Sequence, residues 1–192
     1  YPTAPHFNEK FTHENFLDEI IRTNYGTNLP DLSLYYHLPY CDTLCYFCGC
    51  NMLITRNRDR IKEYIKYVQK EIDMLRAYIL PDRKVSQLHW GGGTPTHLNP
   101  DEINELASYI NKSFQFKENS ENGCEIDPRE LKREHLEALR SNGFNRISMG
   151  VQDFNEKVQK AVNRIQPEDI TRQAVEWVRE LGFSSINLDL IY

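Results

Sequence analysis

The stretch LSLYYHLPYCDTLCYFCGC, residues 32–50, joins a strand-like run at 32–37 directly to a loop that holds four cysteines. Three of them, Cys41, Cys45 and Cys48, have the spacing C-x3-C-x2-C, which differs from the ferredoxin spacings. Three thiolates on one short loop can hold three irons of a [4Fe–4S] cluster and leave the fourth iron open. Because an open metal position can bind a substrate or cofactor, the loop predicts a redox enzyme.

Strand-like runs alternate with amphipathic helices along the rest of the chain, which predicts an α/β fold with a parallel sheet of β/α units. The expected strands are 32–37, 85–90, 124–127, 146–152 and 185–192. The expected helices are 13–22, 59–80, one capped by Asn99 with Pro100 at its first position, 128–143, 156–162 and 167–182. The third strand is the weakest prediction, because residues 117–123 before it are polar.

The composition is that of an ordinary globular domain, with 192 residues, 40% hydrophobic and 27% charged. A net charge of −5 argues against a general nucleic-acid or anionic-membrane binder. No apolar run approaches the roughly 20 residues that span a bilayer. Four of the five cysteines are too crowded for a disulfide framework, so we expect a reducing, cytoplasmic location and metal binding.

Polar elements follow the predicted strands at the edge where ligands bind in parallel α/β sheets. These elements are the cysteine loop, the turn 91–93, Glu125, Gln152 and Asp189. Their convergence on one rim predicts a single site.

Several motifs resemble those of the radical S-adenosylmethionine (SAM) superfamily and, within it, of the oxygen-independent coproporphyrinogen III oxidase (coproporphyrinogen dehydrogenase) family. The matching segments are YPTA at 1–4, HLPYC at 37–41, CYFCGCN at 45–51, HWGGGTPT at 89–96, DPRE at 127–130 and GFNRISMGVQDF at 143–154. The cysteine triad marks only the superfamily, whereas Cys50 directly after Cys48-Gly49 favours the oxidase family.

The resemblance implies cofactor roles for particular residues. Cys41, Cys45 and Cys48 would hold the cluster, and two SAM molecules would bind near it. The residues that match SAM-lining positions are Tyr35, Gly92, Gly93, Thr94, Glu125, Gln152, Arg164, Asp189 and Ile191. Glycines allow the backbone to lie against the methionyl part, Thr94 can hydrogen-bond its polar end, and Asp189 is a candidate partner of a ribose hydroxyl.

The resemblance also implies the reaction. One electron cleaves SAM to methionine and a 5′-deoxyadenosyl radical, which removes a β-hydrogen from a propionate of coproporphyrinogen III. Loss of CO2 and one electron leaves a vinyl group, and two such rounds give protoporphyrinogen IX, a step of anaerobic heme biosynthesis. The implied partners are coproporphyrinogen III and an unidentified low-potential electron donor, with no nucleic acid or membrane, and the full-length form is expected to be a monomer.

Two other functions stay open at this point. A zinc-binding interaction module would use the same thiolates with Cys50 as the fourth ligand, and a heme-binding or heme-trafficking protein would keep the cluster without decarboxylating anything. We expect Cys124 to be a small buried residue and His37 to lie near the cluster. Arg56 and Arg58 are candidates for substrate carboxylates, although solvation at the surface is the favoured interpretation for both.

The resemblance implies a partial (β/α)6-type radical SAM barrel with about five β/α units. We interpret residues 1–30 as an N-terminal extension and 31–192 as the core, truncated before the last unit and a C-terminal domain. An open barrel leaves strand edges unpaired and the site wet, so we expect the isolated fragment to be inactive.

Overall fold

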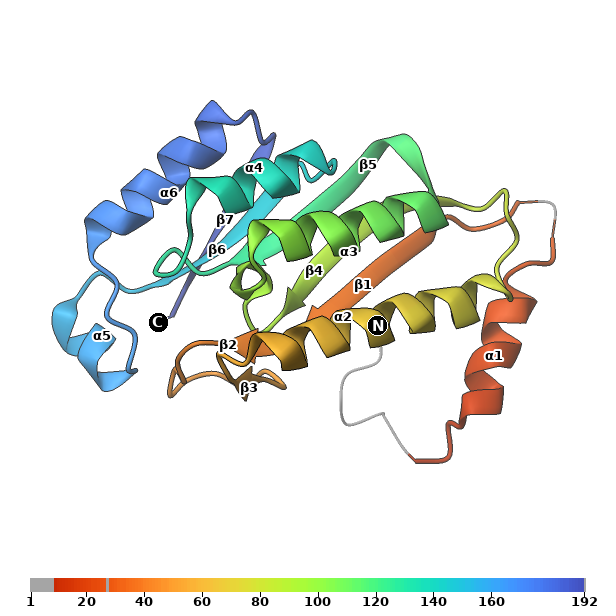
Figure 1. Ribbon diagram of the computed structural model, residues 1–192, viewed down its shortest axis with the longest axis horizontal. Coiled ribbons are helices and arrows are strands. Elements are labelled where there is room, and N and C mark those ends of the chain that lie inside the picture. The colour runs from red at the N-terminus through yellow and green to blue at the C-terminus, as the bar shows by residue number, and fades with distance from the viewer. Residues whose placement is uncertain (1–8, 27, 192) are drawn as a thin grey trace.

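The computed structural model describes residues 9–26 and 28–191, and it contains one five-stranded parallel sheet (Figure 1). The strands, in the order in which they lie side by side, are β1 (Leu32–Leu38), β4 (Lys84–Gly92), β5 (Gln115–Ile126), β6 (Arg146–Gln152) and β7 (Ser185–Leu190). Sequential strands are therefore neighbours in the sheet, as expected for successive β/α units. The predicted α/β class and partial barrel of parallel strands are confirmed.

The helices that connect the strands pack on one face of this sheet (Figure 1). They are α2 (Arg58–Arg76), α3 (Pro100–Ser113), α4 (Arg133–Ser141) and α6 (Glu168–Glu180), with the short α5 (Glu156–Ala161) before α6. The predicted cap of α3 is present as a capping box, in which Asn99 and Glu102 each accept a hydrogen bond from the other's backbone N–H.

β5 is longer than predicted, because the polar stretch that weakened the prediction belongs to the strand. Ser120 and Asn122 are buried there, and hydrogen bonds join both residues to the turn after α4. The Asn145 amide donates to the Ser120 carbonyl at 2.8 Å, and the Asn122 amide donates to the Gly143 carbonyl at 3.0 Å. Partners from the turn between α4 and β6 thus replace the apolar residues that a buried strand normally carries.

Two helices differ from their predicted bounds by four or more residues at one end. α2 ends at Arg76 rather than at residue 80, and Asn24 binds the chain beyond it by donating to the Tyr78 carbonyl at 2.6 Å and accepting from the Leu80 N–H at 3.4 Å. α4 begins at Arg133 rather than at residue 128, because the carboxylate of Asp127 accepts the Arg129 N–H at 3.0 Å and closes a turn first.

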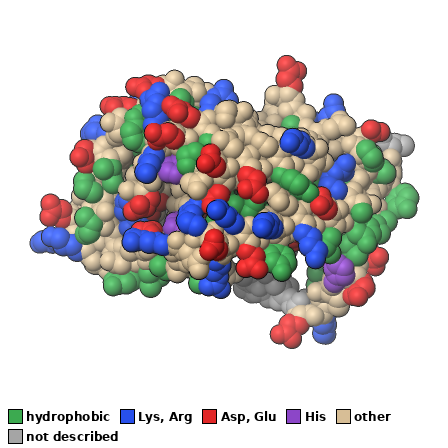
Figure 2. All heavy atoms as spheres, in the orientation of Figure 1, with side chains coloured by type: hydrophobic (Ala, Val, Ile, Leu, Met, Phe, Trp, Pro, Cys, Tyr) green, Lys and Arg blue, Asp and Glu red, His purple; other side chains and the backbone are tan. Residues whose placement is uncertain are grey.

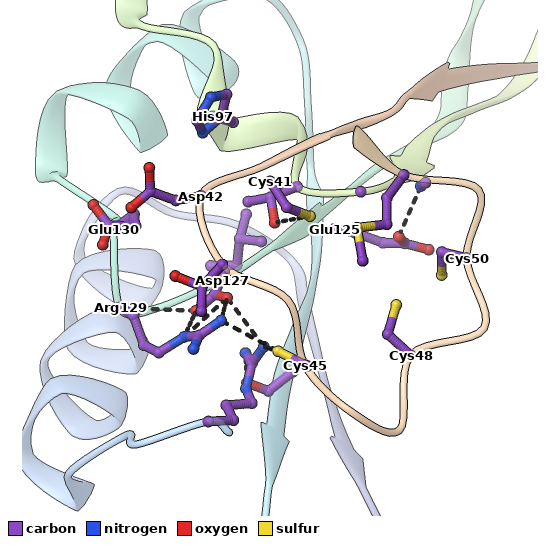
Figure 3. Close-up of a pocket in the computed structure, with 18 of the residues that line it drawn as sticks. Cys41, Asp42, Cys45, Cys48, Cys50, His97, Glu125, Asp127, Arg129 and Glu130 are labelled. Carbon is purple, nitrogen blue, oxygen red and sulfur yellow. Dashed lines mark hydrogen bonds and ion pairs between the residues drawn. The ribbon is translucent and has the colours of Figure 1, made fainter. Parts of the chain in front are cut away.

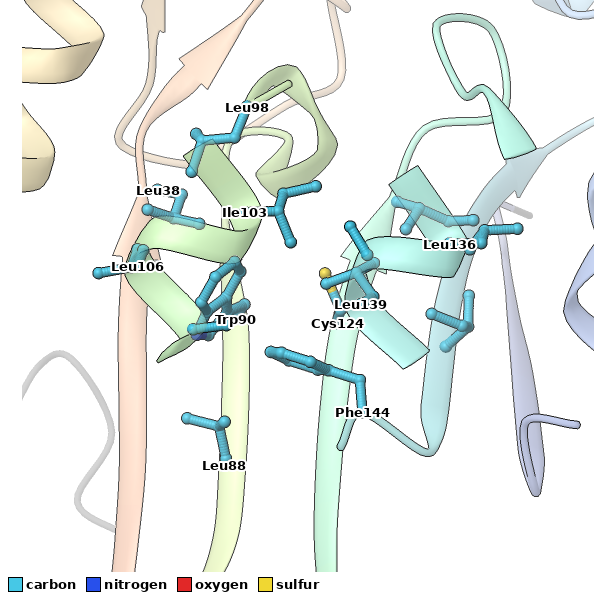
Figure 4. Close-up of a cluster of buried hydrophobic side chains, with 14 of the residues drawn as sticks. Leu38, Leu88, Trp90, Leu98, Ile103, Leu106, Cys124, Leu136, Leu139 and Phe144 are labelled. Atoms are coloured by element: carbon cyan, nitrogen blue, oxygen red, sulfur yellow. The ribbon is translucent and has the colours of Figure 1, made fainter. Parts of the chain in front are cut away.

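The core lies between the sheet and these helices (Figure 4). Trp90 of β4 meets Phe144 edge to face, with ring centroids 5.0 Å apart, and both side chains are fully buried. Leu38, Leu106 and other aliphatic side chains close the space around them. Burying residues of this size contributes roughly 1.5–3 kcal/mol each, which fixes the strands whose ends carry the site.

The part of the chain before β1 contains α1 (His13–Arg22), as predicted, with a capping box at Thr12. The matching segment at 1–4 lies outside the described residues. Acidic, basic and apolar side chains intermingle over the helical face (Figure 2). In the described part of the chain, no helix combines the length and the apolar character that crossing a bilayer requires.

Candidate functional site

A cavity of about 320 Å³ lies between the cysteine loop and the carboxyl ends of the strands (Figure 3). Most of the predicted site residues line it: Cys41, Cys45, Cys48, Gly92, Gly93, Thr94, Glu125, Gln152, Arg164 and Asp189. Tyr35 and Ile191 do not line it. The parallel arrangement thus brings together residues that are far apart in the sequence, at the edge of the sheet where the topology predicted a site.

Short strand pairing closes the base of the cysteine loop. β2 (Tyr40–Cys41) pairs with β3 (Leu53–Ile54), and the Leu53 N–H donates to the Pro39 carbonyl at 2.7 Å. The far side of the loop is held by residues after α5, where the Asn163 amide donates to the Leu44 carbonyl at 2.7 Å. Both the base and the far side of the loop are therefore held by hydrogen bonds from other parts of the chain.

The cysteine side chains of the loop face one cavity. All of the described cysteines are free thiols, and Cys50 lines the same cavity as the triad. Cys41, Cys45 and Cys48 all line this cavity. The thiolates of a [4Fe–4S] cluster each bind a different iron, so three cysteines around one cavity can supply three of its ligands. The donor set therefore fits the cluster.

The glycine turn at residues 91–93 packs closely against the backbone at the start of the cysteine loop. Gly92 has a φ of +112°, and a Cβ on Gly93 would lie 2.7 Å from the Pro39 carbonyl carbon. The Gly93 N–H donates to the Leu38 carbonyl at 2.9 Å, which holds the turn against the start of the cysteine loop. The Thr94 hydroxyl then lies 3.4 Å from the Cys41 Sγ. The glycines are thus required for close backbone packing, in addition to any role toward a ligand.

Glu125 is oriented by two neighbouring groups. Its Oε2 accepts the Gly92 N–H at 3.2 Å, and its Oε1 accepts a hydrogen bond from His89 Nε2 at 3.1 Å. Tyr35 stacks on the His89 ring and, through its hydroxyl, contacts His37 Nδ1 at 3.1 Å. Burial, followed by the charge of Glu125, raises the pKa of Tyr35. Tyr35 and His37 are therefore near the cavity without lining it.

A buried charge cluster lies beside Cys45. Asp127 binds Arg129 through several hydrogen bonds, the shortest 2.6 Å, and binds Arg164 Nη1 at 3.0 Å. Burial opposes ionisation of the Asp127 carboxyl, but the hydrogen bonds and charges of the two guanidinium groups outweigh it and lower its pKa. Arg164 also donates to the Gly150 carbonyl at 2.7 Å, so protein contacts already hold its guanidinium group in place.

The ends of β6 and β7 supply the remaining polar wall. Gln152 has a φ of 71°, and its carbonyl accepts the Ile191 N–H at 3.0 Å. Asp189 accepts hydrogen bonds from Ser148 Oγ at 3.2 Å and from the Asn187 amide at 2.7 Å. Ile191 thus touches the site through its backbone, while Asp189 presents an exposed carboxylate to the cavity.

Sequence reasoning gave no role to Arg129 or Ser148, which line the cavity. The sequence did contain a signal for Arg129, because it lies two residues after Asp127, just beyond a predicted strand. Arg56 and Arg58 do not line the cavity, and instead form ion pairs with Asp42 and Glu102. Cys124 is fully buried in the core, as predicted (Figure 4), and burial raises the pKa of its thiol.

Comparisons with known proteins agree with this geometry. Coproporphyrinogen III oxidase of the oxygen-independent type from Escherichia coli is 47% identical over the whole chain, and that from Helicobacter pylori strain 26695 is 43% identical. The chain spans only 41–42% of the length of these relatives.

A solved structure described as coproporphyrinogen III oxidase from Escherichia coli, a radical SAM enzyme, superposes on the whole chain with a TM-score of 0.92 and 46% identity, and 43% of that chain is covered. The structure described as native anSMEcpe with bound AdoMet shares the fold alone, with a TM-score of 0.55 and 12% identity over 82% of this chain and 42% of that chain. The sequence pattern that defines the radical SAM superfamily matches residues 35–192, most of the chain. The chain belongs to the radical SAM superfamily.

Proposed function

We propose that this chain is the cluster- and SAM-binding part of an oxygen-independent coproporphyrinogen III oxidase. The observation that carries the proposal is the meeting of the cysteine triad with Thr94, Glu125 and Asp189, each from a different strand end, around one cavity. The identity of 38–47% to relatives with this name over the whole chain supports the substrate assignment.

Cys41, Cys45 and Cys48 would ligate a [4Fe–4S] cluster, and the other lining residues would hold SAM. Together these groups, when reduced, supply a 5′-deoxyadenosyl radical that takes a hydrogen atom from the substrate. Glu125 is held by His89 and the Gly92 N–H, so its carboxylate is oriented to accept a hydrogen bond from an amino group. Thr94 can hydrogen-bond a polar group beside Cys41.

The other lining residues position the nucleoside part. Asp189 carries an exposed carboxylate, which suits two neighbouring hydroxyl groups, and Ser148 and Asn187 fix its rotamer. Gln152 presents its side chain to the same cavity from a constrained backbone. Two SAM molecules would share these contacts.

The whole protein would convert two propionates of coproporphyrinogen III to vinyl groups and give protoporphyrinogen IX, CO2 leaving from each. Its electrons would come from a low-potential donor, and it would act as a cytoplasmic monomer. Residues 1–30 would form an extension and 31–192 the core. Because β7 is an exposed edge in the described structure, we expect this chain alone to form no product.

Anaerobic reconstitution with iron and sulfide, followed by EPR with and without SAM, tests the proposal. We expect about four irons and four sulfides per chain and a reduced-cluster signal that shifts on addition of SAM. Zinc uptake without a brown chromophore would overturn the proposal and leave a zinc module. A cluster whose EPR signal does not change on addition of SAM, together with stoichiometric heme binding, would favour the heme-binding alternative.

A further inference from the structure

The charge cluster beside Cys45 contains two positive side chains and one negative side chain. Two guanidinium groups, those of Arg129 and Arg164, share the single carboxylate of Asp127. The three side chains expose at most 17% of their surface. An unbalanced charge at such a buried place costs several kcal/mol unless an anion accompanies it.

Besides Asp127, both arginines contact the sulfur of Cys45. Arg129 Nη2 lies 3.5 Å from its Sγ, and Arg164 Nη1 lies 3.7 Å from it (Figure 3). With a cluster bound, Cys45 would be a thiolate ligand whose sulfur faces both guanidinium groups. The cysteine loop, the turn after β5 and the segment after α5 therefore bring two cations to one ligating sulfur.

The three triad cysteines differ in this respect. Cys41 contacts the neutral hydroxyl of Thr94 at 3.4 Å, and no guanidinium hydrogen bond to Cys41 or Cys48 occurs in the described part of the chain. Of the three triad sulfurs, that of Cys45 would therefore be the one that faces two cations among the described residues. Hydrogen bonds and charge at a ligating sulfur are the means by which proteins set the potential of iron–sulfur clusters.

We propose that Arg129, held in place by Asp127, is a positioning residue that sets the reduction potential of the cluster through the sulfur of Cys45. This inference rests on the proposed cluster binding and adds a role for a residue outside the ligands. Reduction adds a negative charge to the cluster, and the positive charge that Asp127 alone does not balance favours the reduced state. Removing the cation lowers the potential, and removing the carboxylate raises it.

The test is a redox titration of the reconstituted protein, followed by the EPR signal of the reduced cluster, on wild type and two variants. In Arg129→Gln we expect the ratio of reduced to oxidised cluster at a fixed potential to fall about tenfold, a shift of about 59 mV for a one-electron couple. In Asp127→Asn, which keeps the shape and one acceptor oxygen, we expect the ratio to rise.

Arg133→Gln is the matched control, because Arg133 likewise forms ion pairs, with Glu137 and Glu180, but lies outside the cavity. The reduction potential of the cluster in this variant should equal that in wild type. Damage to the fold would move both test variants in the same direction or lower their iron content, so opposite shifts at equal iron content support the inference. Equal potentials, or shifts of the same sign, overturn it. A wild-type protein that takes up no cluster would overturn the proposed function as well.

Discussion

The ring of Tyr35 stacks on the ring of His89, with centroids 6.0 Å apart and an interplanar angle of 12°. The two residues are paired neighbours on β1 and β4. His89 also donates to Glu125, so the stack extends a chain of contacts from the outermost strand to the cavity. Tyr35 therefore acts on the site through His89.

Replacing His89 with Phe should weaken SAM binding while the cluster still forms. Phenylalanine keeps a ring for Tyr35 to stack on, but it cannot donate to Glu125. Loss of one hydrogen bond to a charged group costs about 1.5 kcal/mol, or roughly a tenfold rise in the SAM dissociation constant. The SAM-dependent EPR shift measures this constant. Gln87→Ala, on the same face of β4 but away from the cavity, should bind SAM as wild type does.

Phe144→Ala should lower the free energy of unfolding by about 3–5 kcal/mol, because it removes a fully buried ring that packs against Trp90. Urea denaturation measures the change. Phe154→Ala removes the same side chain from a position that is 50% exposed, and it should change the free energy by less than about 0.5 kcal/mol. Similar losses in the two variants would contradict the assignment of Phe144 to the core.

Gly93→Ala should destabilise the protein by about 2 kcal/mol or more, since the added methyl meets the backbone of Pro39 and Tyr40 at 2.7–2.9 Å. Backbone cannot rotate away as a flexible side chain can. Gly49→Ala is the comparison, because a Cβ there meets nothing within 4 Å. Urea denaturation of both cluster-free variants should give a large loss for the first and a small change for the second. A tolerated Gly93→Ala would show that the turn is looser than its contacts imply.

His135 should make the protein less stable below pH 6.5. Burial, followed by the charge of Lys132, lowers the pKa of His135, and its Nδ1 accepts the Lys132 N–H at 3.0 Å. The folded state thus binds this proton less readily than the unfolded state, whose pKa is about 6.5. The stabilising contribution is complete above pH 6.5 and is lost as the pH falls toward the lower folded pKa.

In His135→Gln the side-chain oxygen can accept the same N–H, but the side chain does not titrate. The free energy of unfolding of this variant, measured by urea denaturation between pH 7.5 and 5.5, should fall less than that of wild type. Parallel pH profiles would contradict a depressed pKa at His135.

The sequence predicted the elements that hydrophobic periodicity defines, and it missed those that polar tertiary contacts define. β6 has its predicted bounds, because apolar residues alternate along it. β5 begins nine residues before its predicted start at 124, because its polar residues find partners on Asn145 and Gly143, which no local pattern reveals. Within the site, parallel topology was sufficient to bring Glu125 and Asp189 together. The position of Arg129 beside Cys45 depends on a turn that replaces the first part of a predicted helix.

The hydrogen bond from Asn163 to Leu44 joins residues 119 positions apart. During synthesis the cysteines leave the ribosome long before the segment that holds their loop. At typical rates of about 5–20 residues per second, that interval lasts about 6–24 s. Throughout it the thiols lie on a loop whose far side has no anchor, so the final shape of the loop is reached only after the chain beyond α5 has been made.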